Sequence, residues 1–391
     1  MRDSLRRNPG RALRVLHCPL VALYQPALLV DGLRRHGLEA DSMIFDFGED
    51  RWLSLGVDIN LGLDRCNSWQ RLFRIQLFLF HAAKHYDIFH FHSGRTLLPL
   101  WVDSRWSPVP EPLRPFLSWM RAADFADLRL LKRLGKKLVF SFWGCDIRKP
   151  TELSENPDYL CHHCLPGERQ CQTPFRKNLV RSLVRFGDAV ILSGDIIRSW
   201  PDARWVPNAL DLRVWNPTKV AAEVPDRYRV KKNGKLLLLH AFANSDKRGD
   251  HKGSGRIRET VQNLIQEGLP LQFLSVDGVP VEDMKYIQVQ ADLVIDQFRL
   301  GCYGSFGLES MALGRPVVGW INPDLYREQP EMPPMVTTDL RSLGATLRDL
   351  VSNPSRMEEI GRACRGYVEK VHDHVKVAGT IERIYRNLYA H

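Results

Sequence analysis

The chain has 391 residues, more than the roughly 250–300 at which a single hydrophobic core stops growing, so two domains of roughly 200 residues each are expected. Hydrophobic residues make up 44% and charged residues 26%, a globular composition that excludes bulk disorder. The net charge of +10 is uneven, with +9 in residues 1–220 and +1 in the remainder. This asymmetry indicates either a solvated basic face or an anionic partner for the first half, such as a lipid surface, an acidic glycan or a phosphorylated acceptor.

Apolar runs in the sequence are far shorter than the ~20 residues that a membrane-spanning helix needs. The basic N-terminus lacks the apolar stretch of a signal peptide. We therefore expect a cytoplasmic protein, with peripheral attachment to the inner face of the membrane as an option. The eight cysteines do not make a disulfide scaffold and should be mostly reduced in that compartment.

Strands and helices alternate in the first half of the chain. The expected strands are residues 13–18, 40–47, 87–92, 137–142, 188–192 and 205–207, and the expected helices are 28–36, 69–85 and 128–134. Glycines close the first and third of these helices at Gly37 and Gly135. Alternation at this spacing predicts a parallel sheet covered on both faces by helices.

The alternation restarts at residue 236, after a polar stretch interrupted by prolines. The expected strands are 236–240, 271–276, 293–296 and 316–319, and the expected helices are 257–267, 307–313, 340–352, 357–370 and 375–388. We predict a first domain over 1–212 with insertions at 105–119 and 151–174, a linker over 213–234 and a second domain over 235–373. A C-terminal helix occupies 374–391, with a return to the first domain as one option. A ligand would bind in the cleft between the two sheets, because open parallel sheets bind ligands beyond the carboxyl ends of their strands.

A glycine-spaced loop, with Gly301, Gly304 and Gly307, joins the strand that ends near Asp296 to the following helix. The first amides of a helix have no intrahelical partners and its dipole favours negative charge. Glycines allow this backbone to approach a diphosphate closely. Glu309, in the first turns of the helix, carries a carboxylate that can accept hydrogen bonds from ribose hydroxyls.

Residues 306–318, Phe-Gly-Leu-Glu-Ser-Met-Ala-Leu-Gly-Arg-Pro-Val-Val, resemble the C-terminal signature of the retaining GT-B glycosyltransferases of glycosyltransferase family 4. The resemblance implies two Rossmann-like domains facing a cleft. It also implies transfer of a sugar from a nucleotide-diphosphate donor to an acceptor hydroxyl with retention, without a cofactor. The family often has a further glutamate eight positions before Glu309, where this chain has Gly301. A GT-B protein that binds nucleotide sugars or acts as a scaffold, with impaired transfer, is therefore the alternative.

Other segments extend the resemblance. Lys252, which precedes Gly253, matches a family lysine that reaches the donor diphosphate, and Lys247 and Arg248 compete for this role. Residues 206–211 resemble the segment that ends the first domain of the family. His92 ends a segment that resembles the family's Asp-x-x-His-x-His, and Asp146 lies in a loop like its His-Gly-x-Asp, where Trp143 replaces the histidine.

The resemblance thus assigns a catalytic set and a donor-binding set. The catalytic set is His92, Asp146, Lys252 and Glu309. The donor-binding set is Asn244, Lys247, Arg248, Lys252, Gly304, Ser305, Phe306, Gly307 and Glu309. The expected acceptor is a glycan, a lipid-linked molecule or a small molecule, and no nucleic-acid-binding motif is present. After the first strand, Tyr24 and Gln25 are candidates for acceptor contacts.

Three more segments carry alternatives. Cys161, Cys164 and Cys171 suggest a structural zinc, with Cys145, His162 or His163 as the fourth ligand; free thiols or a labile disulfide are the alternatives. The helix over 69–85, rich in Phe and Trp, is expected to be a core helix rather than an interfacial one. The stretch 105–119, rich in Pro and Trp, is the better candidate for contact with a membrane or an acceptor.

Overall fold

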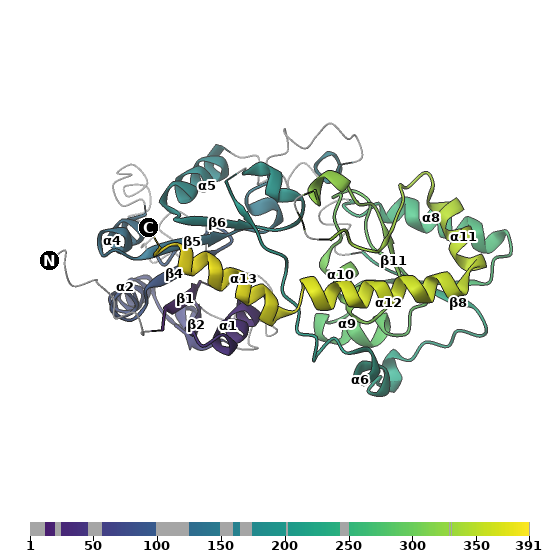
Figure 1. The fold of residues 1–391 in the computed structure, drawn as a ribbon, viewed down its shortest axis with the longest axis horizontal. Helices are drawn as coiled ribbons and strands as arrows, with labels where there is room; N and C mark the ends of the chain where they lie inside the picture. The colour runs from purple at the N-terminus through teal and green to yellow at the C-terminus, as the bar shows by residue number, and fades with distance from the viewer. Residues whose placement is uncertain are drawn as a thin grey trace.

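The computed structural model describes residues 12–19, 25–45, 57–98, 125–148, 159–164, 174–200, 202–242, 250–327, 329 and 331–390. They form two α/β domains, each built on one parallel sheet (Figure 1). Every pair of neighbouring strands in both sheets is parallel. The predicted class of two doubly wound parallel sheets is therefore confirmed.

The first domain contains a seven-stranded sheet in the order β3-β2-β1-β4-β5-β6-β7. Its strands are β1 (Arg14–Cys18), β2 (Glu39–Ile44), β3 (Ile59–Asn60), β4 (Ile88–His92), β5 (Lys137–Ser141), β6 (Ala189–Leu192) and β7 (Arg204–Trp205). Its helices are α1 (Gln25–Arg35), α2 (Ser68–His85), α4 (Ala126–Arg133) and α5 (Pro174–Phe186). The strand order reverses between β1 and β4, which is where such sheets bind ligands.

The second domain contains a five-stranded sheet in the order β12-β11-β10-β8-β9. Its strands are β8 (Leu236–Ala241), β9 (Leu271–Val276), β10 (Leu293–Ile295), β11 (Val317–Gly319) and β12 (Val336–Thr337). Its helices are α8 (Ser254–Gln266), α9 (Val281–Gln288), α10 (Ser305–Ala312), α11 (Leu343–Ser352) and α12 (Pro354–Val371). Here the order reverses between β8 and β10.

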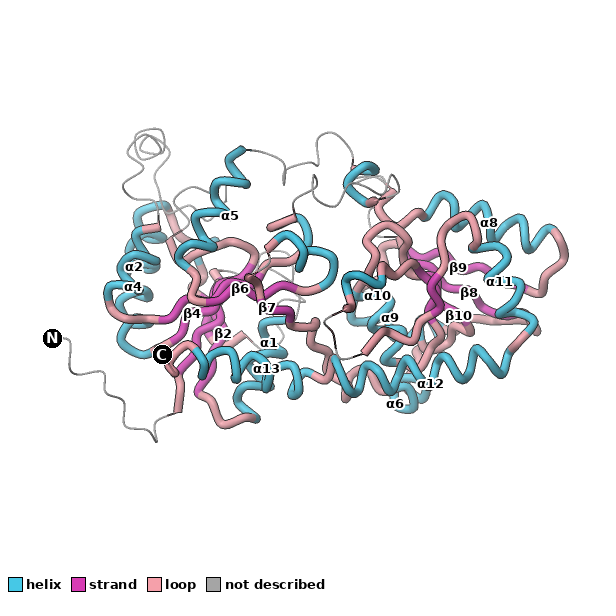
Figure 2. Tube along the Cα trace, turned by 45° about the horizontal axis from the view of Figure 1, so that its top comes forward, coloured by secondary structure: helices cyan, strands magenta, loops and turns pink. Residues whose placement is uncertain are grey.

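Helices cover both faces of each sheet (Figure 2), and each face has its own buried apolar cluster. In the first domain, one face packs against α2, α4 and α5, and the other against α1. In the second domain, α9, α10 and α12 cover one face and α8 and α11 the other. The strands are mostly apolar, as burial on both faces requires, but β1 and β4 also bury histidines.

The last helix, α13 (His374–Asn387), lies against α1 in the first domain although it follows α12 of the second domain (Figure 1). Gly32 of α1 permits this approach, because a Cβ there would lie 2.5 Å from the Cβ of Ala378. Val377, Ile381 and Tyr385 of α13 are buried in the first-domain core. The first domain is therefore assembled from two separate parts of the chain.

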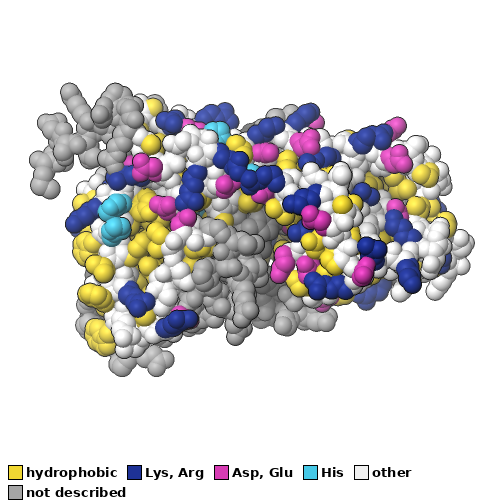
Figure 3. All heavy atoms as spheres, turned by 90° about the horizontal axis from the view of Figure 1, so that it is seen from below, with side chains coloured by type: hydrophobic (Ala, Val, Ile, Leu, Met, Phe, Trp, Pro, Cys, Tyr) yellow, Lys and Arg dark blue, Asp and Glu magenta, His cyan; other side chains and the backbone are white. Residues whose placement is uncertain are grey.

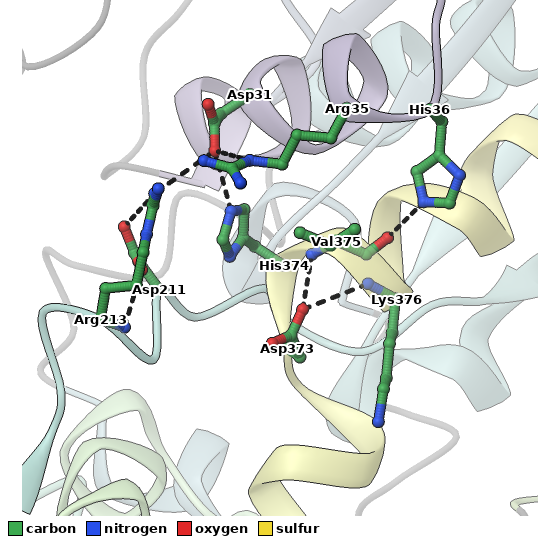
Figure 4. A network of polar contacts seen from close by, with 9 residues as sticks. All are labelled: Asp31, Arg35, His36, Asp211, Arg213, Asp373, His374, Val375 and Lys376. Carbon is green, nitrogen blue, oxygen red and sulfur yellow. Dashed lines mark hydrogen bonds and ion pairs between the residues drawn. The ribbon is translucent and has the colours of Figure 1, made fainter.

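Polar contacts fix the crossing between the domains (Figure 4). Leu210 and Asp373 form a parallel β-bridge, with the Leu210 amide donating to the carbonyl of His372 at 2.8 Å. The Asp31 carboxylate of α1 is 2.9 Å from Nε2 of His374 and 3.4 Å from Nη2 of Arg213. The chain thus passes between the domains twice, near Leu210 and near Asp373, and hydrogen bonds join the two passages. We call this region the hinge.

Several features differ from the sequence-based expectations. Helices α5 and α9 and the two-residue strands β3 and β12 were not predicted, and residues 213–234 contain the short helix α6 (Pro217–Ala222). Helix α2 was expected to be a core helix, but only its inner face is buried. The stretch 105–119 lies outside the described residues, as does most of 151–174. Among the described helices, none has the length and apolar character needed to cross a membrane.

Candidate functional site

A cavity of about 270 Å³ lies between the two domains. The first domain contributes Trp143, Arg148, Ser193 and Asn208 to its walls, among other residues. The second domain contributes Tyr303, Gly304, Ser305 and His372. Gly304 and Ser305 are the cap and first residue of α10, so the cavity opens onto the N-terminus of that helix.

The reversal point of the second sheet carries charged side chains. Asp296 follows β10 directly, is fully buried, and accepts a hydrogen bond from the Gly304 amide at 2.7 Å. It also accepts a hydrogen bond from the Gly307 amide. A side chain at Gly307 would clash with this carboxylate, because its Cβ would lie closer to the carboxylate than van der Waals contact allows. The carboxylate therefore caps α10 from inside, a role that the sequence analysis did not foresee.

Lys252 reaches the same point from the loop before α8. Its Nζ donates to the carbonyl of Ala241 at 2.7 Å, lies 4.0 Å from Oδ1 of Asp296, and stands over the ring of Phe306. Burial lowers the pKa of Lys252, and the carboxylates of Asp296 and Glu309 oppose this shift. Lys252 and Glu309 thus interact electrostatically although 56 residues separate them, and Glu309 itself is buried in α10.

Gly301 occupies the position where the resembling family often has a glutamate. Its φ of +74° lies in the left-handed region that disfavours side chains. A Cβ at this position would lie 2.9 Å from the Cβ of Asn322 and 3.2 Å from Cζ3 of Trp320. The Gly301 carbonyl also accepts from the Asn322 amide at 2.9 Å. This loop conformation has no room for a glutamate side chain, so the local backbone structure itself requires glycine at position 301.

The reversal point of the first sheet carries three histidines instead. His17 of β1 and His90 and His92 of β4 are all fully buried. Nδ1 of His17 lies 3.0 Å from Nε2 of His92, and the Tyr385 hydroxyl lies 2.6 Å from Nδ1 of His90 and 3.2 Å from Nε2 of His17. Nε2 of His90 lies 2.6 Å from Oγ of Ser141. The groups form one hydrogen-bonded chain from His92 to Ser141, to which α13 contributes the central hydroxyl.

Burial keeps this histidine cluster neutral. It lowers the pKa of His17 to about 3, and it lowers the pKa of His90 and His92 well below the ordinary value, with the neighbouring imidazoles adding to the shift. The three imidazoles are close enough to share a metal ion. However, the rings of His90 and His92 stack with centroids 4.5 Å apart and planes at 24°. A metal must lie near the plane of each ligating ring, so this stacking favours the hydrogen-bonded chain.

Trp143 separates His92 from the cavity. Its ring stacks on that of His92, with centroids 5.2 Å apart and planes at 11°, and it lines the cavity. Asp146, in the 3-10 turn Gly144–Asp146, is half-buried and accepts from the Trp143 amide at 3.4 Å. Of the first-domain residues predicted as catalytic, His92 therefore lies beneath the cavity wall, while Asp146 holds the turn that carries Trp143.

An ion pair beside Trp143 was not predicted as such. Nε and Nη2 of Arg148 donate to the Asp195 carboxylate at 2.8 and 2.9 Å, and both side chains are nearly fully buried. The Tyr159 hydroxyl donates to the same carboxylate at 2.6 Å. This bidentate pairing commits the Arg148 guanidinium to Asp195. Its partner comes from a segment 47 residues away that has no recognisable motif.

Residues of the hinge complete the cavity wall. The Gln25 amide pairs with both backbone groups of Ala209, at 2.7 and 2.8 Å, so its contacts fix the turn that carries Asn208. The Tyr303 hydroxyl lies 2.7 Å from Nε2 of His372, whose Nδ1 lies 2.7 Å from the Asn208 carbonyl. Sequence reasoning missed Tyr303 and His372, because only the folded hinge brings them beside Asn208.

The cysteine loop lies between the domains. Leu160 donates its amide to the carbonyl of Arg299, and Sγ of Cys164 lies 3.3 Å from Nε2 of His251, both in the second domain. Within the described part of the chain, Cys161 and Cys164 do not belong to a group of three ligands close enough to hold a metal ion. Four candidates from the sequence analysis, Cys171, Asn244, Lys247 and Arg248, lie outside the described residues, as does Tyr24.

Comparison with known proteins identifies the fold. No protein-family model and no curated protein sequence matches the chain. Among solved structures, the catalytic domain of starch synthase IV from Arabidopsis thaliana, bound to ADP and acarbose, matches with a TM-score of 0.59 and 11% identity, over 97% of this chain and 100% of that one.

Two further solved structures match over nearly their whole length. Anabaena HepE in complex with UDP and glucose has a TM-score of 0.56 and 13% identity, over 96% of this chain and 99% of that one. Sucrose-phosphate synthase from Thermosynechococcus elongatus has a TM-score of 0.55 and 14% identity, over 97% and 100%. At these identities the likeness shows the fold, which is the two-domain GT-B architecture expected from the sequence.

Proposed function

We propose that this chain is a glycosyltransferase that moves a sugar from a nucleotide-diphosphate donor to an acceptor hydroxyl with retention. One observation carries the proposal: Lys252 stands over the ring of Phe306 in the first turn of α10, where the interdomain cavity opens, and Glu309 is buried in the same helix. An ammonium group and the first amides of a helix together form a site for a diphosphate. A buried carboxylate one turn further along suits the ribose hydroxyls.

The donor would bind as follows. Lys252 lies nearest to the diphosphate and stabilises the charge that develops when it leaves, which is the main catalytic contribution expected here. The amides of Ser305 and Phe306 hold the phosphate oxygens, because Asp296 takes those of Gly304 and Gly307. Lys247, Arg248 and Asn244 remain proposed donor contacts from the loop before α8. Glu309 binds the ribose.

The similar solved structures support a donor of this class. HepE is found with UDP and glucose and the starch synthase with ADP, so proteins of this architecture bind nucleoside diphosphates. The proposed acceptor is a glycan, a lipid-linked molecule or a small molecule, in the synthesis of a glycan, glycolipid or secondary metabolite in the cytoplasm. It would enter beside Trp143, which gives the cavity an aromatic wall. The leaving phosphate accepts the proton of the acceptor hydroxyl, so the reaction needs no general base from the first domain.

First-domain residues would act on the acceptor side. Asp146 holds the turn that carries Trp143, and His92 supports the Trp143 ring from below. We therefore propose both as positioning residues for the acceptor wall. Their replacement should raise the KM for the acceptor more than it lowers kcat.

The experiment is a transfer and hydrolysis assay with UDP-, GDP- and ADP-sugars, on the wild type, Lys252→Met and Glu309→Gln. We expect each variant to lose about 100- to 1,000-fold in kcat/KM, the size of losing one preorganised charge contact. Lys235→Met, an exposed lysine of the same domain, is the matched control. Thermal melting curves check that the variants fold. If both Lys252→Met and Glu309→Gln kept wild-type turnover, the assignment of Lys252 and Glu309 to the donor site would be wrong.

A second candidate function is supported by the Gly301 loop. The family position of a sugar-contacting glutamate is sterically closed to any side chain, so a binding or scaffold protein with impaired transfer is a defined alternative. Calorimetry with UDP, GDP and ADP distinguishes the two. Nucleotide binding that Lys252→Met abolishes, with no turnover of any donor sugar, would favour the binding protein.

A structural zinc held by Cys161, Cys164 and Cys171 also remains a proposal. The Cys-x-x-Cys spacing supports it. Metal analysis of the purified protein under reducing conditions tests it, with Cys164→Ser as the variant expected to lose the metal. Protein that carries no zinc after expression in zinc-supplemented medium would exclude the site.

A further inference from the structure

The outer face of α2 exposes an unusual amount of apolar surface. Four large side chains at helical spacing, three or four residues apart, are more than half exposed: Trp69 (63%), Phe73 (66%), Leu77 (60%) and Phe80 (58%). They form a continuous stripe along the helix, since side chains at these spacings share one face. We call this stripe the α2 face. It contains half of the exposed large hydrophobic side chains in the described part of the chain.

The inner face of α2 is equally apolar. Ile75, Phe78, Leu79, Ala82 and Ala83 are buried against the first sheet. A surface helix normally places polar residues opposite its buried face, whereas α2 places aromatic ones there. The inner face accounts for the stability of α2 without the outer one. The α2 face is therefore available for another contact.

The charged residues of α2 are all basic. From Arg65 to Tyr86 the chain has four Arg and Lys residues and no Asp or Glu. Arg65, Arg74 and Lys84 are exposed, and Lys84 follows the stripe at the C-terminal end of α2. Figure 3 shows hydrophobic side chains on the surface of the first domain, with histidine, Lys or Arg, and Asp or Glu side chains around them. A stripe of Trp, Phe and Leu bordered by cations matches a lipid interface with anionic headgroups.

A second copy of the chain is a poorer occupant. An 18-residue helix is about 27 Å long, so a face about 10 Å wide offers roughly 270 Å². Stable protein–protein interfaces bury about 800 Å² per partner. Two copies packed face to face would also bring their Arg74 and Lys84 side chains together without a balancing carboxylate in this helix. Size and charge both favour a bilayer, where the apolar stripe enters the headgroup boundary and the cations meet phosphate.

We propose that the α2 face binds the surface of an anionic lipid membrane, with the helix lying in the plane of the interface. The contact is peripheral, because α2 does not qualify as a membrane-spanning helix. This proposal does not require the transferase activity. Vesicle binding is measured without nucleotide or acceptor, so the test of membrane binding and the test of sugar transfer can fail independently.

The experiment is co-sedimentation with large vesicles of phosphatidylcholine, with or without phosphatidylglycerol. The wild type should sediment with the anionic vesicles and remain in solution with the neutral ones. A quadruple variant should bind at least tenfold more weakly while keeping its melting temperature, because the replaced side chains are mostly exposed. It carries Trp69→Gln, Phe73→Gln, Leu77→Gln and Phe80→Gln. A charge variant, Arg74→Gln with Lys84→Gln, should bind severalfold more weakly and lose the preference for anionic lipid.

Matched controls come from the second domain. Val281→Gln and Met332→Gln change apolar side chains that are 39% and 47% exposed, and their vesicle binding should equal that of the wild type. Wild-type protein that fails to sediment with anionic vesicles would overturn the proposal, as would a quadruple variant that still binds. Analytical ultracentrifugation provides the third outcome. A wild-type dimer that becomes monomeric in the quadruple variant, with no vesicle binding in either, would assign the face to a second copy.

Discussion

The two sheets present opposite chemistry at equivalent places. Where the first sheet reverses its strand order, between β1 and β4, stand three neutral, fully buried imidazoles joined by hydrogen bonds. Where the second sheet reverses, between β8 and β10, stand a lysine and two carboxylates beside the N-terminus of α10. The histidines at the first reversal point, here called the neutral half, are uncharged, whereas the second reversal point, the charged half, carries ionised groups. The Arg148–Asp195 ion pair is a separate feature of the first-domain wall. A shared fold thus fixes the place of a site, whereas the side chains decide what it binds.

The difference also suggests a division of work within the proposed reaction. In the charged half, Lys252 and the first amides of α10 suit a diphosphate. In the neutral half, the histidines support Trp143, the proposed acceptor wall. Histidines held neutral by burial do not attract the leaving group to the wrong side. Three further experiments test how far this contrast extends.

The largest effect is expected from acid. Histidines that are neutral when buried must stay unprotonated in the folded state but bind protons once unfolded, so stability falls as the pH drops below about 6.5. With a folded pKa of about 3, His17 alone removes about 2 kcal/mol at pH 5. His240 and His372, whose pKa burial lowers to about 4, act in the same direction. Urea unfolding between pH 7.5 and 5 measures the loss.

The contribution of His17 can be isolated with a matched variant. His17→Gln has no titrating ring at this position, so its free energy of unfolding should depend on pH less steeply than that of the wild type. Surface His85→Gln is the control and should leave the slope unchanged. If the free energy of unfolding depended equally on pH in all three proteins, burial would not be what keeps the histidine cluster neutral.

A smaller effect is expected at the charged half. Asp296→Ala removes the carboxylate that caps α10 and leaves Lys252 half-buried without its nearest counter-charge. We expect a loss of about 3 kcal/mol in the free energy of unfolding. The exposed Asp226→Ala, on the same domain, should change it by less than about 0.5 kcal/mol. Similar losses for the two variants would mean that Asp296 contributes little to the cap.

The smallest effect is expected from the hydroxyl that joins α13 to the histidine cluster. Tyr385→Phe keeps the packing of the ring but leaves nitrogen atoms of His17 and His90 without a partner. The cost should be about 1–2 kcal/mol in chemical unfolding. Tyr286→Phe on the second domain is the control, and its ring packs against that of Tyr228. An unchanged free energy of unfolding in Tyr385→Phe would indicate that the histidine cluster tolerates the loss of this hydroxyl.

The charged half was easier to predict from the sequence than the neutral half, for a physical reason. Residues 306–318 form one continuous helix-to-strand segment, so the spacing of its residues along the chain was enough to predict its local geometry. The sheet architecture was also predictable, because apolar runs and glycine-ended helices are local signals. The function of these residues, by contrast, still rests on the proposed assay.

The neutral half depends on long-range contacts. His17 meets His92 across 75 residues and Tyr385 across 368, and no local pattern reports such contacts. The commitment of Arg148 to Asp195 and the capping by Asp296 were also invisible, because each depends on a partner placed by the fold. For the same reason, periodicity alone did not reveal which apolar face of α2 stays exposed.

The return of α13 to the first domain has a consequence for biogenesis. Val377, Ile381 and Tyr385 complete the core of the first domain, and every other strand and helix described for that domain lies before residue 206. During synthesis, that domain must wait for some 170 further residues before its last helix leaves the ribosome, so its histidine cluster stays open until then. A stop codon that removed α13 would therefore damage the domain made first rather than the one made last.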